Sequence, residues 1–304
     1  MKKSICLLMC AVLLCISFTG CTANGEKEKE DNTETAVSDI KITFDSHYSD
    51  MGDSAVRAYE KLCTAVINHE TEIKFNTSMM EDVNQLFYTS FPLYVLVDGM
   101  EFLDDNTGVS ITYKYESEEH TKKVNEFKNA VNEIMRTCGY GSVGNNQYVL
   151  NIYTYIASNV TIDNSVTTVM DTVINKRGIS ATISGMFEYL LLQADISASH
   201  IMNLDSNSIA RMISMAEFNG GTYYFDPASE INENSGSGLV YFAMDSSRAT
   251  VSSNDEFVFT DKTKPEEIAD NTYDMLATCT SYKVEGNKVI ADCKGNDDFE
   301  FILN

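Results

Sequence analysis

The sequence predicts an α+β fold, because stretches with helical spacing of apolar residues occur together with stretches typical of β-strands. Residues 51–70 carry apolar side chains at helical spacing, whereas residues 109–115 strictly alternate apolar and polar side chains. Asn219-Gly220 separates two further strand-like runs, and this dipeptide favours a hairpin because both central positions of a type I′ turn need positive φ. Helices combined with antiparallel hairpins define the α+β class.

The other elements are predicted from the same helical and strand periodicities and from the residues that end each element. Gly139 is a natural stop for the helix that precedes it. The expected elements are helices at 51–70, 77–87, 117–137 and 147–158, a hairpin of 92–103 with 109–115, and a hairpin of 278–285 with 288–293. The acidic tip of the first hairpin, residues 104–108, could bind calcium. It lacks the ligand spacing of a known calcium loop, so a solvated turn is the better interpretation, and we assign no metal and no cofactor.

A helix that faces the core is expected to begin near Ser180. Gly178 interrupts the chain just before it, and the apolar residues that follow recur at helical spacing, namely Ile183, Met186, Phe187, Leu190 and Leu191. Ser180 itself is expected to cap this helix, because a serine oxygen readily accepts a hydrogen bond from an amide of the first turn.

This region resembles the bacterial transglutaminase-like (papain-like) superfamily. Gly178-Ile179-Ser180, with Phe187 and Leu190-Leu191 behind it, resembles the Gly-Val-Cys segment that opens the family's catalytic helix. Residues 220–227, Gly-Gly-Thr-Tyr-Tyr-Phe-Asp-Pro, resemble its Asp-bearing strand, and Tyr241-Phe242 resembles a pair downstream. The resemblance covers about residues 145–250. It implies a papain-like core with a Cys nucleophile, a His base and an orienting Asp, whose positions here are Ser180, Arg211 and Asp226.

Two of these three residues do not suit the chemistry. A Cys at a helix N-terminus reacts as a thiolate, whereas the hydroxyl of Ser180 needs a real base. Arg211 cannot be that base, because a guanidinium stays protonated. The family's two Trp residues fall on Ile213 and Thr222, and the chain contains no Trp. The sequence therefore favours a degenerate triad on a retained scaffold.

Arg211 and Asp226 are expected to form an ion pair. A two-residue Asn219-Gly220 loop pairs Phe218 with Gly221, which places Arg211 one diagonal step from Asp226 on the same face of the hairpin. A three-residue loop would put the two side chains on opposite faces. The hairpin register therefore decides whether Arg211 fills the place of the family's active site.

Histidine offers one alternative base. His200 is expected to be a strand residue with an ordinary hydrogen bond, and its alternative role is a displaced base for Ser180. The other three histidines, His47, His69 and His120, lie in the N-terminal part and suggest no site.

The first residues resemble a bacterial lipoprotein leader. Lys2-Lys3 precede the apolar run 5–18, and small residues stand just before Cys21. This lipobox-like pattern implies cleavage before Cys21, a lipid on its sulfur and a place on the outer face of the cell membrane; the alternative is a plain signal peptide. Residues 1–20 are then the leader, and residues 21–39 form a polar tether. Residues 40–144 are expected to form a helix and hairpin module. Residues 145–304 are expected to form a transglutaminase-like domain with a C-terminal hairpin.

The formal charge of −23 limits the partners of this chain. Such an acidic chain is repelled by nucleic acid and can favour cations or basic peptides, although acidity also serves solubility.

Four cysteines lie beyond the leader and Cys21, with no zinc-like spacing. A three-residue loop at 285–287 would place Cys279 opposite Cys293 for a disulfide. Cys63 and Cys138 are the other candidate pair.

Three hypotheses remain open. The first is a membrane-anchored, non-catalytic binding protein for a peptide, a protein or a peptidoglycan fragment. The second is an acyl hydrolase or transferase that uses Ser180 as its nucleophile. The third is an assembly role for the acidic surface. The missing Cys and His favour the first.

Overall fold

The computed structural model describes residues 39–75, 78, 80–103, 107–205, 208–234, 237–250, 255–295 and 297–304. The predicted leader, the lipidation at Cys21 and the tether as far as residue 38 lie outside the described residues, as does part of the acidic tip, 104–106. Within the described part, no helix combines the length and the apolar character that a membrane span requires. The elements below belong to one compact unit, Val37–Asn304.

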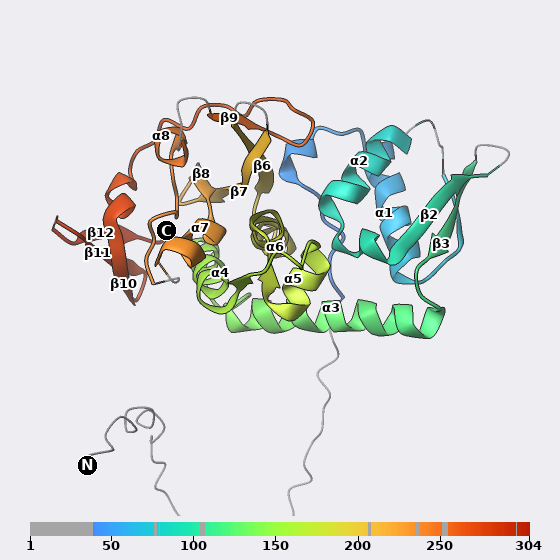
Figure 1. Cartoon of the computed structure of the whole chain (residues 1–304), viewed down its shortest axis with the longest axis horizontal. Helices are drawn as coiled ribbons and strands as arrows, with labels where there is room; N and C mark the ends of the chain where they lie inside the picture. The colour runs from blue at the N-terminus through green and yellow to red at the C-terminus, as the bar shows by residue number, and fades with distance from the viewer. Residues whose placement is uncertain are drawn as a thin grey trace, which may run out of the picture. The chain divides into compact units, whose positions relative to one another are not determined.

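The N-terminal half combines helices with a small antiparallel sheet whose strand order is β1-β3-β2. In Figure 1, the long helix α3 runs below these elements and continues beneath α5. The elements are η1 (Ser46–Tyr48), α1 (Asp53–Ile67), β1 (Glu72–Lys74), α2 (Met80–Ser90), η3 (Pro92–Leu96), β2 (Val97–Phe102), β3 (Gly108–Tyr113) and α3 (Ser117–Thr137). The helix predicted at 117–137 has these same bounds, and Gly139 follows it with a φ of +85°.

One part of the first hairpin differs from the prediction. Residues Pro92–Leu96 form a 3-10 helix instead of the start of a strand. Pro92 stands at the beginning of this turn, where its fixed φ suits a helix and its missing amide is not needed. Leu93 and Leu96, three residues apart as one 3-10 turn requires, are both fully buried.

The C-terminal half contains the helix α6 and a four-stranded antiparallel sheet, with a second hairpin near the end of the chain (Figure 1). The confirmed fold class is α+β. The elements are α4 (Asn145–Asn159), β4 (Thr161–Ile162), α5 (Val169–Asn175), β5 (Arg177–Gly178), α6 (Ser180–Gln193), β6 (Ala198–Asp205), β7 (Ser208–Phe218), β8 (Gly221–Phe225), α7 (Pro227–Asn234), α8 (Ser246–Ala249), β9 (Asp255–Val258), η4 (Asp274–Thr278), β10 (Cys279–Glu285), β11 (Lys288–Cys293) and β12 (Phe299–Ile302).

The central sheet has the strand order β8-β7-β6-β9, and its β7–β8 turn is the predicted one. Phe218 pairs with Gly221, so the loop contains two residues, Asn219 and Gly220. Their φ angles are +50° and +80°, as a type I′ turn requires. The register on which the Arg211–Asp226 prediction depends is therefore present.

Apolar side chains cover both faces of this sheet. The face toward α6 belongs to a core that extends from Ile40 to Leu303 and includes the fully buried Phe187 and Phe225. The other face carries a smaller cluster of Ile201, Ile213, Tyr224, Met244, Ala249 and Phe259. The core therefore draws on residues from both predicted modules, and the boundary between 144 and 145 stays a prediction.

The C-terminal hairpin reaches the predicted cysteine register by a different route. Glu285 pairs with Lys288, so the turn has two residues and not three. The register shifts by one residue between Cys279 and Ser281, and this bulge brings Cys279 opposite Cys293. The predicted loop length was wrong, whereas Cys279 and Cys293 do lie opposite each other as predicted.

All four described cysteines carry free thiols in this structure, so the structure contains neither predicted disulfide. Cys138 donates a hydrogen bond to the carbonyl of Asn151, 3.7 Å away. Cys63 is fully buried in α1, beside Tyr59. Burial raises the pKa of each thiol, which keeps it protonated. These two residues therefore behave as core residues in this state.

Candidate functional site

Ser180 is the first residue of α6, and it does not cap the helix. Ile179 occupies the cap position in an extended conformation. The hydroxyl of Ser180 donates a hydrogen bond to the main-chain carbonyl of Met212 on β7, 3.3 Å away. The predicted cap was wrong, because a neighbouring strand offers this hydroxyl an acceptor that a sequence does not reveal. Ser180 therefore joins the start of α6 to β7.

Gly178 is needed at this point for close packing. A Cβ atom there would lie 2.4 Å from the Thr182 hydroxyl oxygen and 2.5 Å from that of Thr172. These two hydroxyls form a buried hydrogen bond of 2.8 Å that joins α5 to α6. A glycine before Ser180 thus lets α5 and the start of α6 approach each other.

Arg211 leaves β7 on the side opposite to α6. The hydroxyls of Ser214 on β7 and Ser184 on α6 lie 2.7 Å apart, so Ser214 faces α6. Side chains alternate along a strand, so Arg211 points to the other face. Its guanidinium contacts the carbonyl of Ala249 there. Among the described contacts, none joins Ser180 to Arg211 or Asp226.

The predicted ion pair between Arg211 and Asp226 is confirmed. Nη1 of Arg211 lies 3.1 Å from Oδ2 of Asp226, whose side chain is only 1% exposed. The same carboxylate accepts hydrogen bonds from the amide and the hydroxyl of Ser229, at 2.9 and 2.7 Å. Asp226 thus caps the start of α7 as well. Burial raises the pKa of Asp226, while Ser229 and Arg211 act in the opposite direction.

In this arrangement neither Arg211 nor Asp226 has a described contact with Ser180 through which it could accept the hydroxyl proton. Asp226 is bound to Arg211 and to Ser229, and the guanidinium of Arg211 has no lone pair to offer. The Nε atom of Arg211 is buried without a hydrogen-bond partner among the described residues. The three positions are thus used for packing α6 against β7 and for starting α7.

His200 lies elsewhere, in a buried pair with an acid. Its Nδ1 atom is 3.2 Å from Oε2 of Glu188 on α6, and its backbone amide donates to Asp45. Burial raises the pKa of Glu188, and the charge of Asp45 adds to this; burial also lowers the pKa of His200. Both shifts favour the neutral forms of the two groups. The hydrogen bond predicted for His200 is thereby found. No described contact links the ring to Ser180.

A cavity of about 260 Å³ opens beside this pair, between α6, η3 and β6. Glu188 and His200 line it together with Gly185 and Met212. A Cβ atom on Gly185 would lie 2.8 Å from Val169 and 4.0 Å from the His200 ring, so glycine keeps this part of the wall open. Aromatic and aliphatic groups make up most of the remaining wall.

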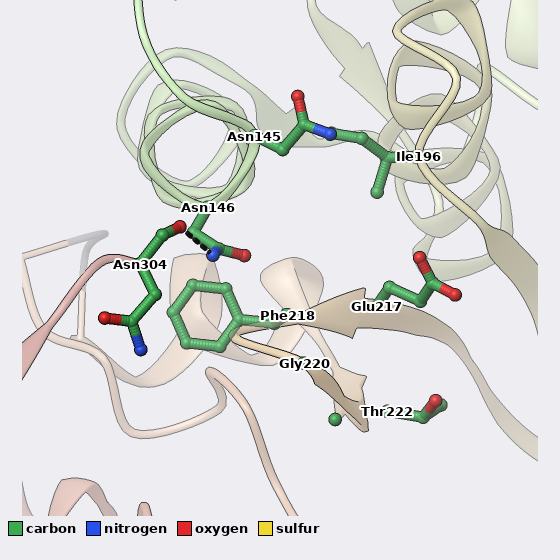
Figure 2. A pocket seen from close by; sticks show the side chains of 9 residues that line it. Asn145, Asn146, Ile196, Glu217, Phe218, Gly220, Thr222 and Asn304 are labelled. Atoms are coloured by element: carbon green, nitrogen blue, oxygen red, sulfur yellow. Dashed lines mark hydrogen bonds between the residues drawn. The ribbon is translucent and has the colours of Figure 1, made fainter.

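A second cavity, of about 560 Å³, lies at the turn between β7 and β8, the far end of β7 from Arg211 (Figure 2). Figure 2 shows Asn146 joined to Asn304 by a hydrogen bond, while Glu217 and Thr222 stand on the neighbouring strands. The side-chain oxygen of Asn146 accepts a bond from the Asn219 amide, 2.7 Å away. The amide group of Asn146 is therefore used to hold the hairpin turn.

The described residues contain no cluster of three or more His, Cys, Asp or Glu side chains that could hold a metal ion. No family model matches the sequence, and no curated protein matches it.

Several solved structures align with parts of this chain. A protease candidate from Parabacteroides distasonis shares 14% identity over 56% of this chain and 35% of its own, with a TM-score of 0.33. A cysteine protease candidate from Cytophaga hutchinsonii shares 19% identity over 33% and 37% of the two chains, with a TM-score of 0.26. A protein described as a TGase shares 8% identity over 68% and 63%, with a TM-score of 0.31.

The chain is thus similar, over part of its length, to proteins described as proteases and as a transglutaminase. It spans between about a third and just under two thirds of each of them. The likeness is too low to carry an argument about activity, which has to come from the residues themselves.

Two residues near the first cavity escaped prediction. Glu188 is the single acid in α6, whose other residues after Ser180 are apolar or uncharged, and this isolation was a usable signal. Asp45 gave no such signal in the sequence, because only the tertiary structure brings its side chain into contact with β6. Its Oδ2 atom accepts the amide of His200 at 2.8 Å.

Proposed function

We propose that this chain is a membrane-anchored surface lipoprotein whose transglutaminase-like domain is catalytically inactive and binds a peptide or a cell-wall ligand. The proposal that the domain is inactive is supported by the arrangement at the triad-equivalent positions. Arg211 is paired with the buried Asp226, and the Ser180 hydroxyl donates to a main-chain carbonyl. A serine nucleophile needs a base within hydrogen-bond reach to accept this same proton.

The family assignment rests on the sequence pattern and on the placement of its parts. A helix that starts at Ser180 packs on an antiparallel sheet, Arg211 lies on β7 of that sheet, and Asp226 directly follows the neighbouring strand β8. The binding role follows because a retained scaffold without a base can still hold a ligand. The anchor rests on the lipobox-like pattern that ends at Cys21.

Serine reactivity tests the inactive state. We expect an electrophilic fluorophosphonate probe to label the full chain no more strongly than it labels Ser180→Ala, because no base raises the nucleophilicity of this hydroxyl. Labelling is read by gel fluorescence and mass spectrometry, with Ser199→Ala as the matched control and a known serine hydrolase as the positive control. Labelling that disappears in Ser180→Ala and persists in Ser199→Ala would favour the acyl hydrolase instead.

Phase partition tests the anchor. The full-length protein, expressed in a bacterial host, should enter the detergent phase of Triton X-114, because a diacylglycerol adds enough apolar surface for stable membrane binding. Cys21→Ser should remain in the aqueous phase, and Cys63→Ser should behave as the unchanged protein does. Equal partition of the unchanged protein and Cys21→Ser would sink the lipoprotein assignment.

A further inference from the structure

The cavity beside α6 contains a buried carboxyl group. Glu188 lies in its wall with a side chain only 6% exposed, and its protein partner there is His200. The carboxylate of Asp45 accepts a hydrogen bond from the backbone amide of His200. Among the described residues, the wall contains no Lys or Arg. The ionisable groups of the wall are therefore Glu188, His200 and three tyrosines, and none of these residues is a permanent cation.

Aromatic side chains also line this cavity and its mouth. Phe91 and Tyr189 belong to the wall, and Tyr88 and Tyr94 stand there with ring centroids 5.6 Å apart in an edge-on arrangement. Tyr88 is 52% exposed, so it borders the mouth of the cavity. The faces of aromatic rings attract cations, and they do so more strongly where water is excluded. Carboxyl and aromatic groups thus enclose one small space.

We propose that this cavity binds a small organic cation, an ammonium group on a short apolar body, with Glu188 as its counter-ion and the tyrosine rings around its apolar part. The volume of about 260 Å³ has room for roughly nine water-sized groups. The formal charge of −23 raises the local concentration of cations around the whole chain. This inference deepens the proposed binding function by naming a site and a class of ligand, and it rests on that function.

The ionisation of Glu188 sets the pH dependence of the proposed binding. The groups that face Glu188 are His200 from β6, Asp45 from the segment before η1, and the wall tyrosines. A bound cation favours the carboxylate, so binding to the protein with a protonated Glu188 releases a proton. Because burial raises the pKa of Glu188, binding is weakened while the carboxyl is protonated and becomes tighter as pH rises through that pKa.

Titration calorimetry with choline and with its neutral isostere, 3,3-dimethylbutan-1-ol, tests the proposal on the full chain. The expected result is choline binding at least about tenfold tighter than the alcohol at pH 8.5, which corresponds to about 1.4 kcal/mol. Affinity should fall at pH 6, and titrations in buffers of different ionisation enthalpy should show proton release. Equal affinities of the two compounds, or no binding of either at millimolar concentrations, would overturn the proposal.

Variants separate the cavity from general charge. Glu188→Gln should lose about tenfold in choline affinity and the pH dependence with it, whereas Glu217→Gln, at the other cavity, should change neither. Tyr88→Ala at the exposed rim keeps the proposal testable if Glu188→Gln does not fold, and it should weaken choline binding several-fold. Unchanged binding in Tyr88→Ala and Glu188→Gln, or in Tyr88→Ala alone if Glu188→Gln does not fold, would place the ligand elsewhere. Ser180 is intact in all these variants. A failure of choline binding would therefore reject the cavity proposal without changing the result of serine labelling, which tests the inactive state.

Discussion

Asp226→Ala should lower the free energy of unfolding by about 3–5 kcal/mol, the cost of leaving a buried charge without its partner. Arg211 would keep its contact with the Ala249 carbonyl and lose Asp226 as its counter-ion, in a place where its side chain is 14% exposed. The substitution also removes the two bonds from Ser229 that start α7, a capping effect of about 1 kcal/mol within that total. Because the chain has no Trp, urea unfolding is best followed by circular dichroism.

Two comparison variants show which part of the loss belongs to the charge pair. Asp226→Asn keeps a side chain that can cap α7 but carries no charge, so its loss should be smaller than that of Asp226→Ala. Arg211→Met should cost less still, because the carboxyl keeps its Ser229 bonds and its raised pKa lets it take up a proton. A loss below about 1 kcal/mol in Asp226→Ala would mean that the pair is solvated in solution.

Oxidation of the full chain should join Cys279 to Cys293 and stabilise the protein by about 3 kcal/mol, the chain-entropy value for closing a loop of about 15 residues. The two residues are register partners in β10 and β11, and both are buried. Burial raises the pKa of Cys279 to about 12, so its thiol is a weak nucleophile in the folded state. The bond should therefore form during folding in an oxidising compartment and exchange slowly afterwards.

Peptide mapping under non-reducing conditions identifies the bond, and urea unfolding with and without a reductant measures its effect. The reductant should destabilise the unchanged protein and Cys63→Ser equally, and it should leave Cys279→Ser unaffected. A mixed peptide of Cys63 and Cys138 would instead support the second candidate pair. Free thiols throughout, after folding with an oxidised glutathione buffer, would contradict the prediction.

The Arg211–Asp226 pair was predictable because it depends on local rules alone. Asn219-Gly220 fixes a two-residue turn, the turn fixes the register, and the strand period of two places both side chains on one face. The C-terminal hairpin shows the limit of this reasoning. Its predicted loop was one residue too long, and a bulge beside Cys279 compensated for the difference. A bulge has no strong sequence signal, since it depends on what packs against the strand.

The role of Ser180 was not predictable in the same way. Serine is a good helix cap in isolation, but β7 brings the Met212 carbonyl within reach of its hydroxyl. Glu188 shows the same dependence on distant residues. Its place in α6 was clear from the sequence, whereas its pairing with His200 and the cavity beside it arise only when α6 packs against β6.

The sequence by itself determined the α+β class, the start of α6 and the turn between β7 and β8. These features follow from spacing, turn chemistry and residue type, which act over a few neighbours. Only the tertiary structure decided which face of β7 carries Arg211, what Ser180 bonds to and which acid stands beside His200. Those contacts join residues far apart in the chain, and their geometry is fixed by packing around a shared core.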